Sequence, residues 1–94
     1  MNIIDAVIEN KVDRIRYLLA RGVDPNGCED DANVSLLDFA AQHGSLEAAQ
    51  LLITAGADPG HQTEDGETPL DTARLCKHED MINLLTKLTH SPLT

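Results

Sequence analysis

The sequence has very few aromatic residues: one tyrosine, one phenylalanine and no tryptophan among 94 residues. This scarcity excludes a core built around large rings. The apolar residues are instead leucine, isoleucine, valine and alanine, which suit thin layers of helices stacked side by side. A chain of this length fits one small domain. We therefore expect residues 1–94 to form a single domain.

Basic residues are also scarce, with 7 lysines and arginines against 16 aspartates and glutamates, so the formal net charge is −9. A nucleic-acid partner is not expected, because binding a phosphate backbone requires clustered lysine and arginine. An anionic membrane surface is disfavoured for the same reason. The charge favours a protein partner with a basic surface.

Long apolar runs are missing as well. No run approaches the ~18 residues needed to span a bilayer. The chain begins Met-Asn-Ile-Ile-Asp, with an acid where a secretory signal would carry a base, and no long apolar segment follows. A cytoplasmic location is the resulting expectation.

A strong helix start is present at residues 68–73, which read Thr-Pro-Leu-Asp-Thr-Ala. Thr68 can accept a hydrogen bond from an otherwise unpaired backbone N–H, and Pro69 fits the first helical position, where its missing N–H costs nothing. Asp71 can reach back to the N–H of the capping residue and favours the positive end of the helix dipole. Gly66 fits a tight turn just before the helix.

Two patterns recur along the chain. The helix start returns in weaker form at residues 35–40, Ser-Leu-Leu-Asp-Phe-Ala, 33 positions earlier. Tyr-Leu-Leu-Ala-Arg-Gly-Val-Asp-Pro at 17–25 is matched by Leu-Leu-Ile-Thr-Ala-Gly-Ala-Asp-Pro at 51–59, an offset of 34. With helical periodicity between them, the two motifs indicate a repeat of one turn and two helices. This repeat resembles the ankyrin repeat, whose signature is Thr-Pro-Leu-His-x-Ala.

The resemblance covers nearly the whole chain and places about three units at residues 1–31, 32–64 and 65–94. It implies an all-α, ankyrin-repeat solenoid of stacked helix-turn-helix units with β-hairpin-like finger loops. Apolar residues at helical spacing predict the inward faces of the second helices. These are Val12, Ile15, Leu18 and Leu19 in the first unit, Leu46, Ala49, Leu52 and Ile53 in the second, and Met81, Ile82, Leu84, Leu85 and Leu88 in the third.

The chain departs from the family pattern at the bends and at the caps. Gly44 marks the bend between the helices of unit two, where unit one has Asn10 and unit three has Lys77. Asparagine tolerates the left-handed conformation, whereas Lys77 requires a different geometry or a strained residue. Asp38 and Asp71 replace the histidine of the motif, which puts in doubt the hydrogen bonds that this histidine makes between units. Their capping role remains.

In the family, partners usually bind the concave side formed by the first helices and the fingers. The positions that resemble the variable contact sites are Ile8, Glu9, Asp31, Ala32, Val34, Gln42, His43, Glu64, Asp65, Glu67, Leu75 and Cys76. One interpretation is an acidic rim around a small apolar floor that receives a basic partner. The other is that the acidic loops only keep the protein soluble, and that Ile8 and Leu75 pack between repeats.

The pattern predicts a protein–protein interaction module, a small adaptor or inhibitor that acts as a monomer without a cofactor. The alternative is a structural repeat that completes its stack through an end face, Ile3–Leu19 or Met81–Leu88, by pairing with a second copy or a larger protein, since three units are near the minimum for stability. Light scattering distinguishes the two.

Catalytic and metal-binding patterns are absent. The four histidines match no metal spacing, and Cys28 and Cys76 join no ligand cluster. No Gly-rich phosphate loop or serine-nucleophile motif is present, and carboxylates open to water lack the burial that an acid–base pair needs. On the repeat map the two cysteines lie about two layers apart, beyond the ~7 Å between Cα atoms that a disulfide allows. We expect no enzyme, no metal site and two free thiols, as in a reducing compartment.

Overall fold

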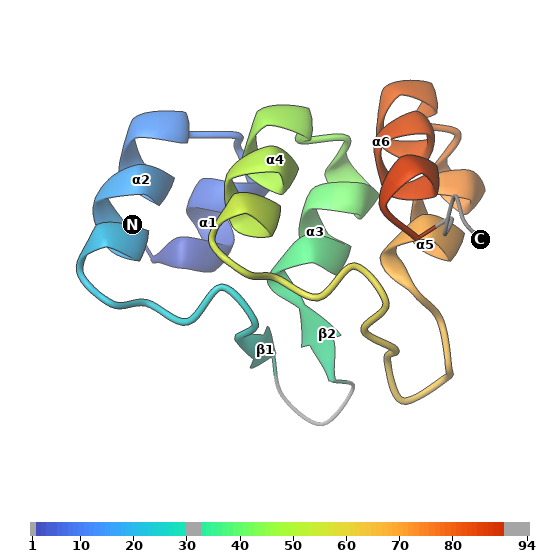
Figure 1. Cartoon of the computed structure of the whole chain (residues 1–94), viewed down its shortest axis with the longest axis horizontal. Coiled ribbons are helices and arrows are strands. Elements are labelled where there is room, and N and C mark those ends of the chain that lie inside the picture. The colour runs from blue at the N-terminus through green and yellow to red at the C-terminus, as the bar shows by residue number, and fades with distance from the viewer. Residues whose placement is uncertain (1, 30–32, 90–94) are drawn as a thin grey trace.

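A computed structural model describes residues 2–29 and 33–89, and within them six helices form three layers (Figure 1). Each layer is a pair of consecutive helices. The pairs are α1 (Ile3–Ile8) with α2 (Val12–Ala20), α3 (Leu36–His43) with α4 (Leu46–Thr54), and α5 (Pro69–Cys76) with α6 (Glu79–Thr89). Helices α1, α3 and α5 pack in series, and α2 packs on α4. The expected all-α repeat stack is confirmed.

The loops between layers extend to one side of the stack as two fingers (Figure 1). Finger 1 is residues 23–34, without the undescribed residues 30–32, and finger 2 is residues 57–67. Strands β1 (Cys28–Glu29) and β2 (Val34–Ser35) pair antiparallel in finger 1. Finger 2 closes through the Thr63 N–H, which donates to the Glu67 carbonyl at 2.9 Å, with Gly66 at a φ of 83°.

Both predicted caps form. The Asp38 N–H donates to Ser35 Oγ at 3.1 Å, and the Ser35 N–H donates to Asp38 Oδ2 at 3.0 Å. The same reciprocal pair joins Thr68 and Asp71 at 3.2 and 3.1 Å. Each aspartate therefore satisfies one unpaired N–H group at the start of its helix, and the capping prediction is confirmed.

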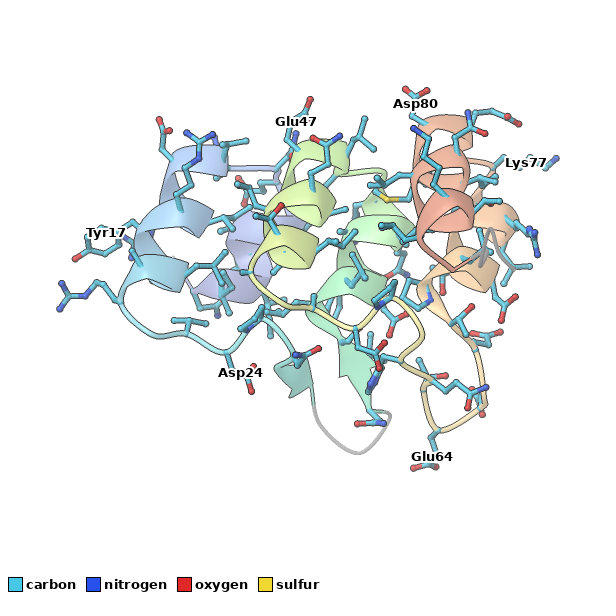
Figure 2. All side chains as sticks on the ribbon, viewed as in Figure 1. Tyr17, Asp24, Glu47, Glu64, Lys77 and Asp80 are labelled. Atoms are coloured by element: carbon cyan, nitrogen blue, oxygen red, sulfur yellow. The ribbon has the colours of Figure 1, made fainter. Side chains whose placement is uncertain are left out.

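The bend inside each layer is left-handed in all three units, with φ values of 57° at Asn10, 67° at Gly44 and 59° at Lys77. Lys77 is therefore the strained residue rather than the site of a different bend. At Asn10, hydrogen bonding by the side chain offsets the cost of the same left-handed backbone conformation. Its Oδ1 accepts from the Ala48 N–H at 2.9 Å, which caps α4 in the next layer. Lys77 lies at the opposite end of the stack, where its side chain points away from the helices (Figure 2).

Replacing Lys77 by glycine should stabilise the fold by about 0.5–1 kcal/mol, because glycine adopts a positive φ without the steric cost of a Cβ. Asn10→Gly is the matched control, since it makes the same backbone change. It should destabilise the fold by about 1 kcal/mol, because the loss of two hydrogen bonds, from the Ala48 N–H to Asn10 Oδ1 and from Asn10 Nδ2 to Glu47, outweighs the gain from glycine at a positive φ. Urea unfolding followed by circular dichroism measures both. Equal effects of the two substitutions would contradict this account of the bends.

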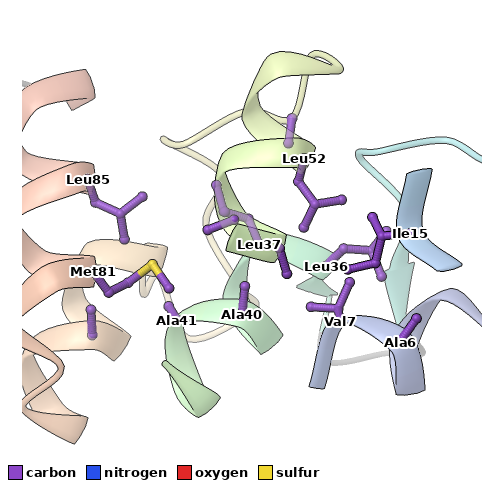
Figure 3. Packing of buried hydrophobic residues seen from close by; sticks show 14 residues of the cluster. Ala6, Val7, Ile15, Leu36, Leu37, Ala40, Ala41, Leu52, Met81 and Leu85 are labelled. Carbon is purple, nitrogen blue, oxygen red and sulfur yellow. The ribbon is translucent and has the colours of Figure 1, made fainter. Parts of the chain in front are cut away.

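The core is a continuous strip of aliphatic side chains that runs through all three layers (Figure 3). Its buried members are Ala6, Val7, Ile15, Leu36, Leu37, Ala40, Ala41, Ala48, Ala49, Leu52, Ala57, Ala73, Met81 and Leu85. The many alanines allow the helices to approach closely. The core is thin, so each large side chain in it fills a substantial part of its layer.

The predicted inward stripes are buried only in part, because Leu46 and Ile53 of the central helix α4 are half-buried, as are several residues at the ends of the stack. In α2 only Ile15 is buried, while Val12, Leu18 and Leu19 are half-buried. Helix α2 lies at the outer end and packs on α1 and α4 alone among the stronger helix contacts. Leu88 of α6 is 43% exposed for the corresponding reason at the other end. The effect of a missing neighbour is clearest for Leu18, which is half-buried in α2, whereas its counterpart Leu52 in the central layer is buried.

Polar contacts between layers recur at matching positions. The Ser45 hydroxyl donates to the Ile8 carbonyl at 3.2 Å, and His78 Nε2 donates to the Gln42 carbonyl at 3.1 Å in the next layer. In the loops, Asn26 Nδ2 donates to the Gly56 carbonyl at 3.0 Å. These residues supply hydrogen bonds between layers, so the contacts do not depend on a histidine at positions 38 and 71.

Candidate binding groove between the first helices and the fingers

A groove of ≈ 250 Å³ lies where α3, α5 and the two fingers meet. We call it the finger groove. Its apolar residues are Val34, Leu75 and Cys76, its neutral polar residues are Gln42, Thr63 and Thr72, and its acidic residues are Asp38 and Glu67. The groove thus combines apolar walls with negative charge and lies on the side of the first helices that faces the fingers.

Five of the residues expected from the sequence are brought together in this groove: Val34, Gln42, Glu67, Leu75 and Cys76. They come from finger 1, α3, finger 2 and α5. The side chain of Leu75 is 71% exposed. Within residues 2–29 and 33–89 Leu75 does not pack between repeats, because no described layer covers it.

The other expected residues do not line the finger groove. Glu64 and Asp65 are exposed in the turn at the tip of finger 2, where Figure 2 shows Glu64 pointing away from the protein. Ile8 is half-buried and Glu9 is exposed at the end of α1, and His43 is exposed at the end of α3. Asp31 and Ala32 lie outside the described residues.

Three groove residues were not predicted as contact sites: Asp38, Thr63 and Thr72. The sequence predicts Asp38 only as a helix-capping residue, although the cap uses one of the two carboxylate oxygens and Oδ1 takes no part in it. Thr63 had no signal in the sequence, because its position depends on how finger 2 folds against α3. Thr72 follows the capping aspartate of α5, and its hydroxyl donates to the Thr68 carbonyl at 3.3 Å.

Asp38 has an unusual environment for a carboxylate. Its side chain is 2% exposed, and Oδ2 accepts hydrogen bonds from both the N–H and the hydroxyl of Ser35 at 3.0 Å. Oδ1 is buried without a hydrogen-bond partner among the described residues. Burial raises the pKa of Asp38, while the Ser35 hydrogen bonds and the nearby His61 act in the opposite direction. The wall of the groove therefore contains a poorly compensated acidic group.

The rim beside the groove is mixed in charge. A shallower depression on the other side of Leu75 is lined by Glu67, Asp71, Arg74 and Leu75 itself. Arg74 is thus a cation of this chain close to the acidic rim. Glu67 is the acidic residue of finger 2 that lines the groove, and Glu64 and Asp65 lie farther out at the tip of the same finger.

The remaining features concern the thiols, groups of metal ligands and helices long enough to cross a membrane. Cys76 is a free and exposed thiol, whereas the expectation for Cys28 stays a prediction because its side chain is not described. Within residues 2–29 and 33–89, no three His, Cys, Asp or Glu side chains are grouped as metal ligands. None of the described helices has the length and apolar character needed to cross a bilayer.

A family model described as "Ankyrin repeats (3 copies)" matches residues 3–92. A 2-5A-dependent ribonuclease of Mus musculus is 38% identical over 68 residues, 72% of this chain and 9% of the ribonuclease. An ankyrin repeat protein of Fowlpox virus (strain NVSL) is 33% identical over 93 residues, 98% of this chain and 21% of the viral protein.

A plant relative is the potassium channel GORK of Arabidopsis thaliana, 37% identical over 79 residues, which cover 84% of this chain and 10% of the channel. In these three comparisons the matched segment spans between 9% and 21% of the relative. The activities named for the ribonuclease and the channel therefore belong to proteins of which the match covers only a small part.

Proposed function

The chain belongs to the ankyrin repeat family, and from this premise we propose that it binds a protein partner with a basic surface through the finger groove and finger 2. Ankyrin repeats are in general protein–protein interaction modules and form a non-catalytic fold. The chain acts as a small adaptor or inhibitor that occludes or tethers its partner. It does so as a monomer and without a cofactor.

The observation that carries this proposal is the convergence of four separate segments on one groove. An exposed leucine in a groove with an acidic mouth is typical of an interface in which an apolar centre is surrounded by a polar rim. Leu75 supplies the apolar surface, and Glu67 supplies charge at the mouth. If the acidic residues served only to keep the protein soluble, an exposed leucine beside them would have no role. The exposure of Leu75 therefore favours a binding surface.

Electrostatics favours a basic partner over long range. The chain carries a net charge of −9, and finger 2 contributes Glu64, Asp65 and Glu67, all exposed. Charges at a solvent-exposed rim add little affinity individually. They act mainly by accelerating encounter with an oppositely charged surface, and their effect weakens as salt rises.

The test is a charge reversal of finger 2, Glu64→Lys with Asp65→Lys and Glu67→Lys. We expect the partner captured by the wild type from a native lysate to be lost, with affinity lower by about tenfold or more at low salt and a smaller difference at high salt. Quantitative mass spectrometry of the captured proteins measures this. Equal capture of every protein by wild type and variant would show that the acidic rim does not bind.

A second triple variant controls for net charge. Asp13→Lys, Glu79→Lys and Asp80→Lys change exposed acids of α2 and α6, away from the groove. Each reversal adds two positive charges, so the net charge rises from −9 to −3 in both variants. The control should retain the partner. Loss of the partner from both variants would indicate dependence on overall charge rather than on finger 2.

The alternative of a self-completing stack keeps some support from the end of the stack. Val12, Leu18 and Leu19 of α2 are half-buried, and Tyr17 is 50% exposed at the outer end (Figure 2). Light scattering on the same preparations separates the two functions. A mass of 10.2 kDa is expected for the monomer, and a dimer that persists at high salt at micromolar concentration would favour the structural alternative.

A further inference from the structure

The finger groove has the size and lining of a site for one side chain rather than for a flat surface. We infer that it is the anchor site for a single arginine side chain of the partner protein, held between Glu67 at the mouth and Asp38 in the wall. This inference rests on the proposed function and specifies the chemistry of the contact.

The apolar residues of the groove suit the stem of a long basic side chain. Leu75 is 71% exposed, Cys76 is exposed and Val34 is half-buried, so apolar surface is accessible from outside. Arginine and lysine bury their methylene groups along such surface while the charged group reaches polar partners. A short acidic or neutral polar side chain would leave this surface uncovered.

The buried carboxylate of Asp38 favours a cation in the groove. Its Oδ1 has no hydrogen-bond partner among the described residues, and a buried polar atom without a partner is costly. Because neighbouring atoms bury Oδ1, a cation in the groove does not contact it directly. The cation is instead attracted to the Asp38 carboxylate by Coulomb interaction through the groove wall. Such attraction is stronger where water is excluded. Binding would therefore compensate a charge that the fold alone leaves poorly compensated.

The arrangement of acceptors favours arginine over lysine. The residues that line the groove include Glu67 and Thr63 of finger 2 and Thr72 of α5, which carry a carboxylate and two hydroxyl groups. A guanidinium group offers five N–H donors in a planar fork and is weakly hydrated, whereas an ammonium group is a compact and strongly hydrated charge. Arginine can engage several of these oxygens at once and loses less hydration when it enters.

Nuclear magnetic resonance titration with three peptides tests this inference. The probes are acetyl-Ala-Ala-Arg-Ala-Ala-amide and its lysine and citrulline analogues, added to ¹⁵N-labelled chain. We expect the arginine peptide to cause saturable amide shifts at residues 34–42, 63–67 and 72–76. Citrulline has nearly the same shape without the charge, and we expect it to bind about tenfold more weakly or worse.

Three results would overturn the inference. The first is an absence of saturable shifts with the arginine peptide up to about 20 mM, well above the millimolar range expected for one side chain. The second is a shift pattern spread evenly over all exposed acidic residues. The third is equal affinity for the citrulline or the lysine peptide, which would remove the role of charge or the preference for a guanidinium group.

A variant that fills the groove provides an independent test. Cys76→Trp introduces a large side chain at an exposed position of α5, and Asn83→Trp introduces the same side chain at an exposed position of α6. We expect Cys76→Trp to abolish the peptide shifts and Asn83→Trp to leave them unchanged. Amide spectra of the free variants report whether each is folded. Retention of the shifts in a folded Cys76→Trp variant would contradict the anchor site.

Capture of the partner separates this inference from the proposed function. If Cys76→Trp keeps the partner while the finger 2 reversal loses it, the acidic rim binds and the anchor does not exist. If both variants keep the partner, the proposed function fails as well. Loss of the partner from both, with retention by Asn83→Trp, supports the rim and the anchor together.

Discussion

Leu37→Ala is expected to lower the free energy of unfolding by about 2–5 kcal/mol, the range found for leucine truncation in well-packed cores. Leu37 lies on α3 in the central layer, where it is 1% exposed and is surrounded by side chains of the core (Figure 3). The core is thin, and alanines make up much of it, so the neighbouring residues have few large side chains that could move into the cavity. Most of the cost should therefore remain.

This loss would be a large share of the total stability, because the free energy of unfolding of a native protein is typically about 5–15 kcal/mol. Urea unfolding followed by circular dichroism measures it. Leu75→Ala is the matched control, since it removes the same atoms from a side chain that is 71% exposed. The control should change stability by about 0.5 kcal/mol or less. Similar losses in the two variants would contradict the burial assigned to Leu37.

Gly44→Ala is expected to destabilise the fold by about 2–3 kcal/mol, from two causes. Gly44 has a φ of 67°, where a Cβ costs about 1–2 kcal/mol. A Cβ at this position would also lie 2.8 Å from Nδ1 and 3.0 Å from Cε1 of His78. The imidazole would have to move, which breaks the hydrogen bond of 3.1 Å from Nε2 to the Gln42 carbonyl and adds about 1 kcal/mol.

A double-mutant cycle separates the two causes. His78→Ser provides the second substitution, because serine occupies the matching position, residue 45, in the preceding layer. In this background Gly44→Ala should retain its backbone strain but lose the clash, so its cost should fall by about 1 kcal/mol. Additive effects in the cycle would show that the imidazole is displaced at no cost.

The residues that stabilise the stack lie in other parts of the layers than the residues of the groove and finger 2. Leu37 and Gly44 act between layers, whereas Leu75, Cys76 and finger 2 face outward beside the groove. Substitutions in the groove should therefore change binding with little loss of stability. Asp38 is the exception, because it both caps α3 and lies in the wall of the groove. It is for this reason left unchanged in the binding experiments.

The sequence alone determined the repeat and its local geometry. The Thr68 cap, the reciprocal bonds of Asp38 and Asp71 and the positive φ values at Asn10 and Gly44 follow from short-range steric and hydrogen-bonding preferences. These preferences act over a few residues and are visible in any one unit. Their recurrence at intervals of 33 and 34 residues was sufficient to identify the stack.

Tertiary structure alone decided which apolar faces are covered and which polar atoms remain unpaired. Leu18 and Leu52 occupy matching positions in their repeats, yet Leu18 is half-buried in the outer helix α2 whereas Leu52 is buried in the central layer. Thr63 joins the groove only because finger 2 folds against α3, and Asp38 Oδ1 is left unpartnered only because the layers close around it. Burial and compensation of charge depend on neighbours far along the chain, and a local pattern does not specify them.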